Sequence, residues 1–149
     1  WSPRGDVIIY ASDEGGLPGS GVTQLFSITP DGLTNTQLTV SGNSSYQPSW
    51  SPDGSRLAFA SDRNGDGDIF VMDPDGQRPE LLTLDGQTGE DRRPVFSPDG
   101  RWVVFLSNRE GETFQLYRVS LDARTLERLS DIDQNLQSFT FRPLTVDVR

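Results

Sequence analysis

The stretch Trp50-Ser51-Pro52-Asp53-Gly54 consists of an aromatic residue followed by Ser-Pro and two turn-forming residues, and this pattern recurs at regular intervals along the chain. An earlier copy occupies residues 1–5, where Arg4 replaces the aspartate, and a later copy occupies residues 96–100. A weaker copy, Phe141-Arg142-Pro143, follows further on. Successive copies lie 45 to 49 residues apart. A period of this length indicates a repeat architecture in which each copy is one supersecondary unit.

Each copy precedes three short apolar segments that have the composition of β-strands. In the middle repeat these segments are 57–61, 69–72 and 81–83, and the other repeats carry matching ones. They contain β-branched and aromatic residues and are bounded by turn residues, and none shows helical periodicity with caps on both sides. Gly54 and Gly76 follow aspartates in the turns, where glycine allows the positive φ of a tight hairpin. Each repeat is therefore predicted to be a four-stranded antiparallel meander.

Stacking explains how such small sheets could be stable. One meander cannot bury both of its faces, whereas several meanders packed face to face around an axis can, and that arrangement is a β-propeller. We therefore predict an all-β fold made of propeller blades, with approximate limits at residues 1–44, 45–90 and 91–134 and a spare inner strand over 135–143. The inner strands would end at aromatic residues that pack between neighbouring blades as core residues, namely Trp1, Trp50, Phe96 and Phe141.

The middle repeat, residues 48–63 followed by 68–76, resembles the repeat of the TolB-like, WD-repeat-like β-propeller family. The third repeat matches well over 96–107 and more weakly over 115–119, and the first carries an insertion around 15–22. The resemblance implies a periplasmic or extracellular, non-catalytic module that binds a protein partner or ligand on one face of the disc. The same repeat occurs in propellers attached to prolyl-oligopeptidase-like and tricorn-like proteases. A propeller gating domain of a larger hydrolase is therefore the alternative.

The composition of the 149-residue chain argues against several function classes. Its net charge of −9 repels nucleic acid phosphates and anionic lipids, so we expect no nucleic acid partner. No apolar run approaches the length of a membrane-spanning helix, and we expect no membrane insertion. The chain has neither His nor Cys, which leaves no Ser-His-Asp triad and no thiolate nucleophile. We therefore expect no catalytic residues and no obligatory cofactor.

One loop has the spacing of a calcium ligand set. Asp62, Asn64 and Asp66 place oxygen atoms at alternate positions, and Gly67 follows at the sixth position. Asp73 falls at the twelfth position, where a calcium loop normally has Glu. A calcium site at Asp62, Asn64 and Asp66 is thus one interpretation of this loop, and a polar hairpin between two strands is the other.

Two further expectations concern contacts with other molecules. The charged run over 90–93 precedes an inner strand, and we expect solvated surface ion pairs there, with partner contact as the alternative. The first repeat lacks most of its inner strand, while 135–143 would be a spare one. Two chains could exchange these strands and close a six-bladed ring as a homodimer. The other interpretation is that the sequence is a fragment of a larger propeller.

Overall fold

The computed structural model describes residues 1–14, 20–83 and 89–130, and these residues form β-strands joined by short turns. None of the described residues belong to a helix long and apolar enough to cross a membrane. The strands are β1 (Ile8–Ser12), β2 (Gln24–Ile28), β3 (Asn35–Gln37), β4 (Ser45–Trp50), β5 (Leu57–Ser61), β6 (Asp68–Met72), β7 (Glu80–Leu81), β8 (Asp91–Phe96), β9 (Trp102–Ser107), β10 (Gln115–Ser120) and β11 (Leu126–Arg128).

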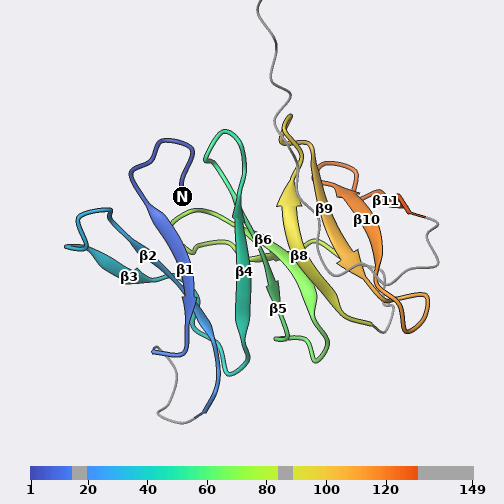
Figure 1. Cartoon of the computed structure of the whole chain (residues 1–149), viewed down its shortest axis with the longest axis horizontal. Helices are drawn as coiled ribbons and strands as arrows, with labels where there is room; N and C mark the ends of the chain where they lie inside the picture. The colour runs from blue at the N-terminus through green and yellow to red at the C-terminus, as the bar shows by residue number, and fades with distance from the viewer. Residues whose placement is uncertain (15–19, 84–88, 131–149) are drawn as a thin grey trace, which may run out of the picture.

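The strands make three antiparallel sheets, and every sheet follows chain order: β1-β2-β3, β4-β5-β6-β7 and β8-β9-β10-β11. Figure 1 shows the sheets side by side in a row, with the first sheet at one end and the third at the other. The prediction of an all-β fold built from stacked meanders is confirmed, with three strands instead of four in the first sheet. The blade limits stay a prediction, and the predicted spare strand over 135–143 lies outside the described residues.

Strand β5 shows how the middle sheet is held between its neighbours. All five of its residues are buried, because the alternating side chains of a strand point to both faces of the sheet. One face packs toward the first sheet in the cluster Leu25, Leu38, Leu57, Phe59, Phe70 and Met72. The other face packs toward the third sheet in a cluster that includes Ala58, Ala60, Ile69, Phe96, Val103 and Phe105. Burying one such aromatic side chain stabilises the fold by roughly 1.5–3 kcal/mol.

The repeated aromatic residues have different environments. Phe96 is buried between the second and third sheets, and Trp50 packs against the cluster between the first and second. Trp1 is 69% exposed, so the prediction that it is a core residue is wrong. Among the described residues no sheet packs on the outer side of the first one, and the indole therefore has no apolar surface to contact. Phe141 lies outside the described residues.

The inner strands β4 and β8 each contain a bulge that the sequence analysis did not predict. The pairing register shifts between Tyr46 and Ser49 in β4, and at the same place in β8. Gln47 and Arg93 stand at these bulges with φ near +54°, a region that residues other than glycine rarely adopt. A hydrogen bond from the Arg93 amide to Oε1 of Gln47, at 2.7 Å, links the two bulges.

Candidate functional site

The Ser-Pro turns join the first and second strands of the meanders and are held by their own side chains. In the middle copy the Ser51 hydroxyl donates to Oδ1 of Asp53 at 2.7 Å and accepts the Arg56 amide at 2.9 Å. The Gly54 amide donates to the Ser51 carbonyl, and Gly54 has the positive φ that the sequence predicts. These bonds fix the backbone of the turn before any ligand arrives.

The other two turns use the same design with one substitution. Ser97 and Asp99 repeat the serine–aspartate contact in the third sheet. In the first copy Arg4 occupies the position of the aspartate, and the Ser2 hydroxyl instead donates to Asp6, two residues further on, at 2.6 Å. Figure 1 shows the three turns (residues 2–7, 51–56 and 97–101) along the upper edge of the row of sheets. We call this edge the Ser-Pro face.

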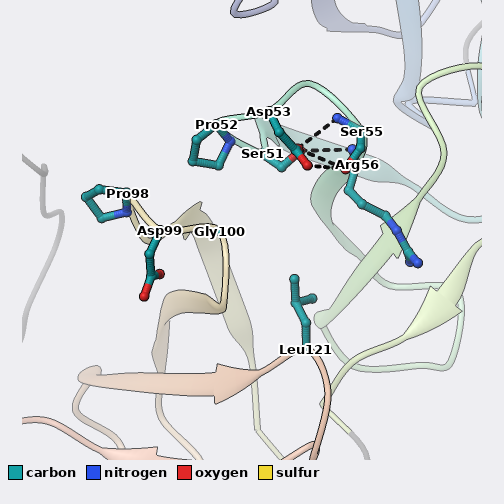
Figure 2. Close-up of a pocket in the computed structure, with 9 residues that line it drawn as sticks. All are labelled: Ser51, Pro52, Asp53, Ser55, Arg56, Pro98, Asp99, Gly100 and Leu121. Carbon is teal, nitrogen blue, oxygen red and sulfur yellow. Dashed lines mark hydrogen bonds between the residues drawn. The ribbon is translucent and has the colours of Figure 1, made fainter.

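A pocket lies on the Ser-Pro face at each junction between sheets. The pocket between the second and third sheets has a volume of about 360 Å³ and is shown in Figure 2. Its lining residues are Ser51, Pro52, Asp53, Ser55, Arg56, Pro98, Asp99, Gly100 and Leu121. The pocket between the first and second sheets measures about 220 Å³ and includes Arg4, Asp6, Trp50 and Pro74. The repeat thus places comparable pockets side by side on one face.

The carboxylates of the larger pocket stay ionised at neutral pH. Hydrogen bonds from the Ser51 hydroxyl, and then from Ser55, lower the pKa of Asp53 to about 2. The Ser97 hydroxyl and the Arg101 amide lower the pKa of Asp99 in the same way. Both negative charges face solvent and belong to turns whose shape is already fixed. With Arg56 also in the lining, the charged side chains of the pocket sum to −1 (two Asp, one Arg), which favours cationic and apolar groups over anions.

The loop with calcium-like spacing lies at the opposite end of β5, away from the Ser-Pro face. Asp66 is exposed, the Asn64 amide donates to Asp68 at 3.4 Å, and Oδ1 of Asp62 is buried without a hydrogen bond. Asp73 lies beyond the far end of β6, where it pairs with Arg78. The described residues contain no group of three or more acidic, His or Cys side chains placed to hold a metal ion. Calcium binding at Asp62, Asn64 and Asp66 stays a prediction.

The expectation of solvated surface ion pairs over 90–93 is wrong for Asp91, which forms a buried ion pair. The side chain of Asp91 is 5% exposed and pairs with Arg109 at 2.7 Å, also 5% exposed. The Arg109 guanidinium lies over the rings of Phe105 and Tyr117, 5.4 and 5.0 Å from their centroids. Asp91 is the first residue of the inner strand β8. Because β8 packs against the second sheet, the Asp91 side chain is shielded from water.

Arg63 repeats this arrangement in the middle sheet. Its guanidinium lies over Phe59 and Phe70 and donates to Ser61 and Ser45, so Ser45 stands where the third sheet has Asp91. These arginines, stacked on aromatic rings and bonded to the first residue of the inner strand, were not predicted from the sequence, although a sequence pattern marks them. Each repeat that uses it has a serine at the end of a strand and an arginine two residues later, as in Ser61 with Arg63 and Ser107 with Arg109.

Three neighbouring antiparallel meanders, packed through both faces of the central one and joined by repeated turns, define the protein as a segment of a β-propeller. The model of the TolB β-propeller domain matches residues 38–143. The chain belongs to that family.

Individual relatives agree with this assignment. The chain is 33% identical over 73 residues to a TolB homologue of Chlorobium luteolum, which covers 49% of this chain and 15% of the relative. A solved structure described as TolB from Agrobacterium tumefaciens superposes with a TM-score of 0.75 and 32% identity, covering 88% of this chain and 44% of that one. The chain thus spans less than half the length of these relatives.

The fold also occurs in hydrolases. The tricorn protease superposes with a TM-score of 0.63 at 18% identity, covering 89% of this chain and 12% of the protease. At this identity the likeness concerns the fold alone. Function has to be argued from the surface of this chain.

Proposed function

We propose that this chain is a non-catalytic binding module that recognises a protein partner on the Ser-Pro face, in the periplasm or outside the cell as its TolB resemblance suggests. The observation that carries the proposal is the pair of pockets at successive sheet junctions on one face. Their walls are turns that internal hydrogen bonds already hold in place. A rigid surface binds with little loss of conformational entropy.

The charges of the larger pocket indicate the chemistry of the partner. Asp53 and Asp99 keep their negative charge at neutral pH and outnumber the one cation of the lining, Arg56, and the chain as a whole carries −9. Pro52, Pro98 and Leu121 add apolar contact surface to the same pocket. A partner segment with Arg or Lys side chains next to apolar ones would complement this surface, and its association would be faster at low salt.

The proposal can be tested by placing a photoreactive amino acid at position 56, in the wall of the larger pocket, in cells that produce the protein. Position 66 is the control, because Asp66 is exposed in the loop that follows the opposite end of strand β5. We expect light-dependent cross-linking to one separate protein from position 56, repeated from position 98 and weak from position 66.

Three results would count against a separate partner. Equal cross-linking from positions 56 and 66, or none from either, would remove the Ser-Pro face as the binding surface. A cross-link from position 56 to a further domain of the same polypeptide would instead support the alternative, a propeller that gates an attached hydrolase.

A further inference from the structure

The two aspartates of the larger pocket differ in what surrounds their carboxylates. Asp53 and Asp99 hold the same position in the repeat, and both line the pocket between the second and third sheets. Two residues further on, the middle turn has Ser55, whereas the third turn has Arg101. The repeat therefore presents the same carboxylate twice, once beside a hydroxyl group and once without one.

The carboxylate of Asp53 is occupied by donors of its own turn. Its Oδ1 accepts the Ser51 hydroxyl at 2.7 Å and the Ser55 amide at 3.0 Å. The Ser55 hydroxyl lies 2.8 Å from Oδ1 and 2.9 Å from Oδ2, so both oxygens have a donor within reach. A carboxylate satisfied in this way has little acceptor capacity left for a ligand. Asp53 therefore contributes its charge to the pocket and holds the shape of the turn.

Asp99 keeps one of its carboxylate oxygens available. Its Oδ1 accepts the Ser97 hydroxyl and the Arg101 amide, but its Oδ2 accepts no hydrogen bond from the described residues, and no arginine among them forms an ion pair with it. The bonds from Ser97 and Arg101 lower the pKa of Asp99, so the available oxygen belongs to an ionised group at neutral pH. Figure 2 shows the Arg56 side chain apart from the Asp99 carboxylate, on the other side of Leu121.

The apolar walls of the pocket belong to turns that contact one another. Pro52 of the middle turn lies next to Gly100 of the third turn, since a Cβ on Gly100 would be 3.7 Å from Cδ of Pro52. The Leu121 amide donates to the Arg101 carbonyl at 3.0 Å, which ties the next turn of the third sheet to the same wall. The apolar surface beside the free oxygen is therefore held in place by its neighbours.

A lysine side chain matches this combination of one acceptor and apolar walls. Its ammonium group is a compact donor that needs a single oxygen, and its four-carbon stem packs along apolar surface. An arginine guanidinium makes its strongest contact by donating to both oxygens of a carboxylate in parallel. Since Oδ1 of Asp99 already accepts two donors, that bidentate contact is not available. The pocket therefore fits lysine better than arginine.

We propose that Asp99 determines the specificity of the Ser-Pro face and binds a lysine side chain of the partner through Oδ2. The stem of that lysine packs along Pro52, Pro98 and Leu121, which line the same pocket. This inference rests on the proposed function and deepens it, because it assigns one kind of partner residue to one pocket and distinguishes the role of Asp99 from that of Asp53.

Position 101 offers a pair of variants that test this role while Asp99 stays in place. Arg101→Ser recreates the Asp-Gly-Ser sequence of the middle turn, so the new hydroxyl is expected to donate to Oδ2 of Asp99, as Ser55 does to Asp53. Arg101→Ala removes the same positive charge but supplies no donor. The two variants therefore have the same net charge and differ in whether Oδ2 is available.

The probe is the peptide acetyl-Leu-Lys-Leu-amide, titrated into the isotope-labelled chain while NMR follows the backbone amides. We expect shifts at residues 99–101 and at Leu121, and several-fold weaker binding of the arginine peptide acetyl-Leu-Arg-Leu-amide. Arg101→Ala should bind the lysine peptide at least as tightly as the wild type. Arg101→Ser and Asp99→Asn should bind it about tenfold more weakly, the loss expected for one hydrogen bond to a charged group.

Several outcomes would overturn the assignment of a lysine to Asp99. They are an absence of shifts near Asp99, equal or tighter binding of the arginine peptide, equal affinity of Arg101→Ser and Arg101→Ala, and wild-type affinity of Asp99→Asn. The proposed function fails by a different result, since an absence of cross-linking from position 56 in cells would remove the partner from this face whether or not the lysine peptide binds.

Discussion

Asp91→Ala is expected to lower the free energy of unfolding by about 3–5 kcal/mol at pH 8, above the folded pKa of Asp91 (about 7), measured by urea denaturation. The substitution leaves the Arg109 guanidinium without the carboxylate that it contacts at 2.7 Å, in a place where both side chains are 5% exposed. Arginine cannot release its proton to escape the cost of burial. The cost should therefore be close to that of other buried ion pairs that lose one partner.

The middle sheet provides a matched comparison for this experiment. Arg63 occupies the same place as Arg109, and the serine hydroxyl of Ser45 accepts its hydrogen bond at 3.1 Å. Asp91→Ser would give Arg109 the serine partner that Arg63 already has. The free energy of unfolding should therefore fall less in Asp91→Ser than in Asp91→Ala. If the two variants are equally destabilised, Asp91 does not stabilise the protein through its contact with the Arg109 guanidinium.

The pH dependence of stability provides a second prediction at Asp91. Burial raises the pKa of this carboxyl group to about 7, even though the nearby guanidinium favours the charged form. The folded state then holds a proton that the unfolded state releases near pH 3.9, so rising pH removes stability until it passes the folded pKa. Stability from this group should fall between about pH 4 and about pH 8, by at most about 4 kcal/mol.

Asp91→Asn isolates that contribution, because it keeps the shape of the side chain and cannot titrate. We expect the wild-type protein to lose stability relative to Asp91→Asn as the pH rises through this range. Chemical denaturation of both proteins at several pH values measures the difference. A difference that is constant with pH would mean that Asp91 is already ionised throughout.

Much of the fold could be predicted from the sequence because its signals are local. Short apolar runs, Asp-Gly turns and a fixed period are visible in the order of residues, and they specified the stacked meanders. Asp91 could not be placed in this way. Its neighbours Glu90, Arg92 and Arg93 are charged, so the run reads as a surface. Only the packing of β8 against the second sheet makes Asp91 a buried residue.

The same limit applies to the surface and to Trp1. The Ser-Pro turns were predicted, but their pockets exist between turns 46 or more residues apart, and a pocket depends on how neighbouring sheets are packed. Trp1 begins the same Trp-Ser-Pro motif as Trp50, yet only Trp50 has apolar residues of a neighbouring sheet around it. A repeat specifies what each unit can bury, and the neighbouring unit determines whether it is buried.

Gly76→Ala is expected to destabilise the protein by about 2–4 kcal/mol, through two separable effects. Gly76 has φ +85° in the turn after β6, where an L-residue is strained. A Cβ there would also overlap the backbone carbonyl oxygen of Leu38, a residue in the core between the first and second sheets. Since that neighbour is backbone, the overlap can be relieved only by moving the two sheets apart.

Gly32→Ala separates the two effects. Gly32 occupies the corresponding turn of the first sheet with φ +73°, and a Cβ there would meet nothing within 4 Å. The free energy of unfolding of this variant should fall by only about 1 kcal/mol, the strain of an L-residue in a left-handed backbone conformation. The excess loss in Gly76→Ala then measures how tightly the turn of one sheet is packed against the next. Equal losses of stability in urea denaturation would mean that the junction between the first and second sheets adjusts easily to an added methyl group.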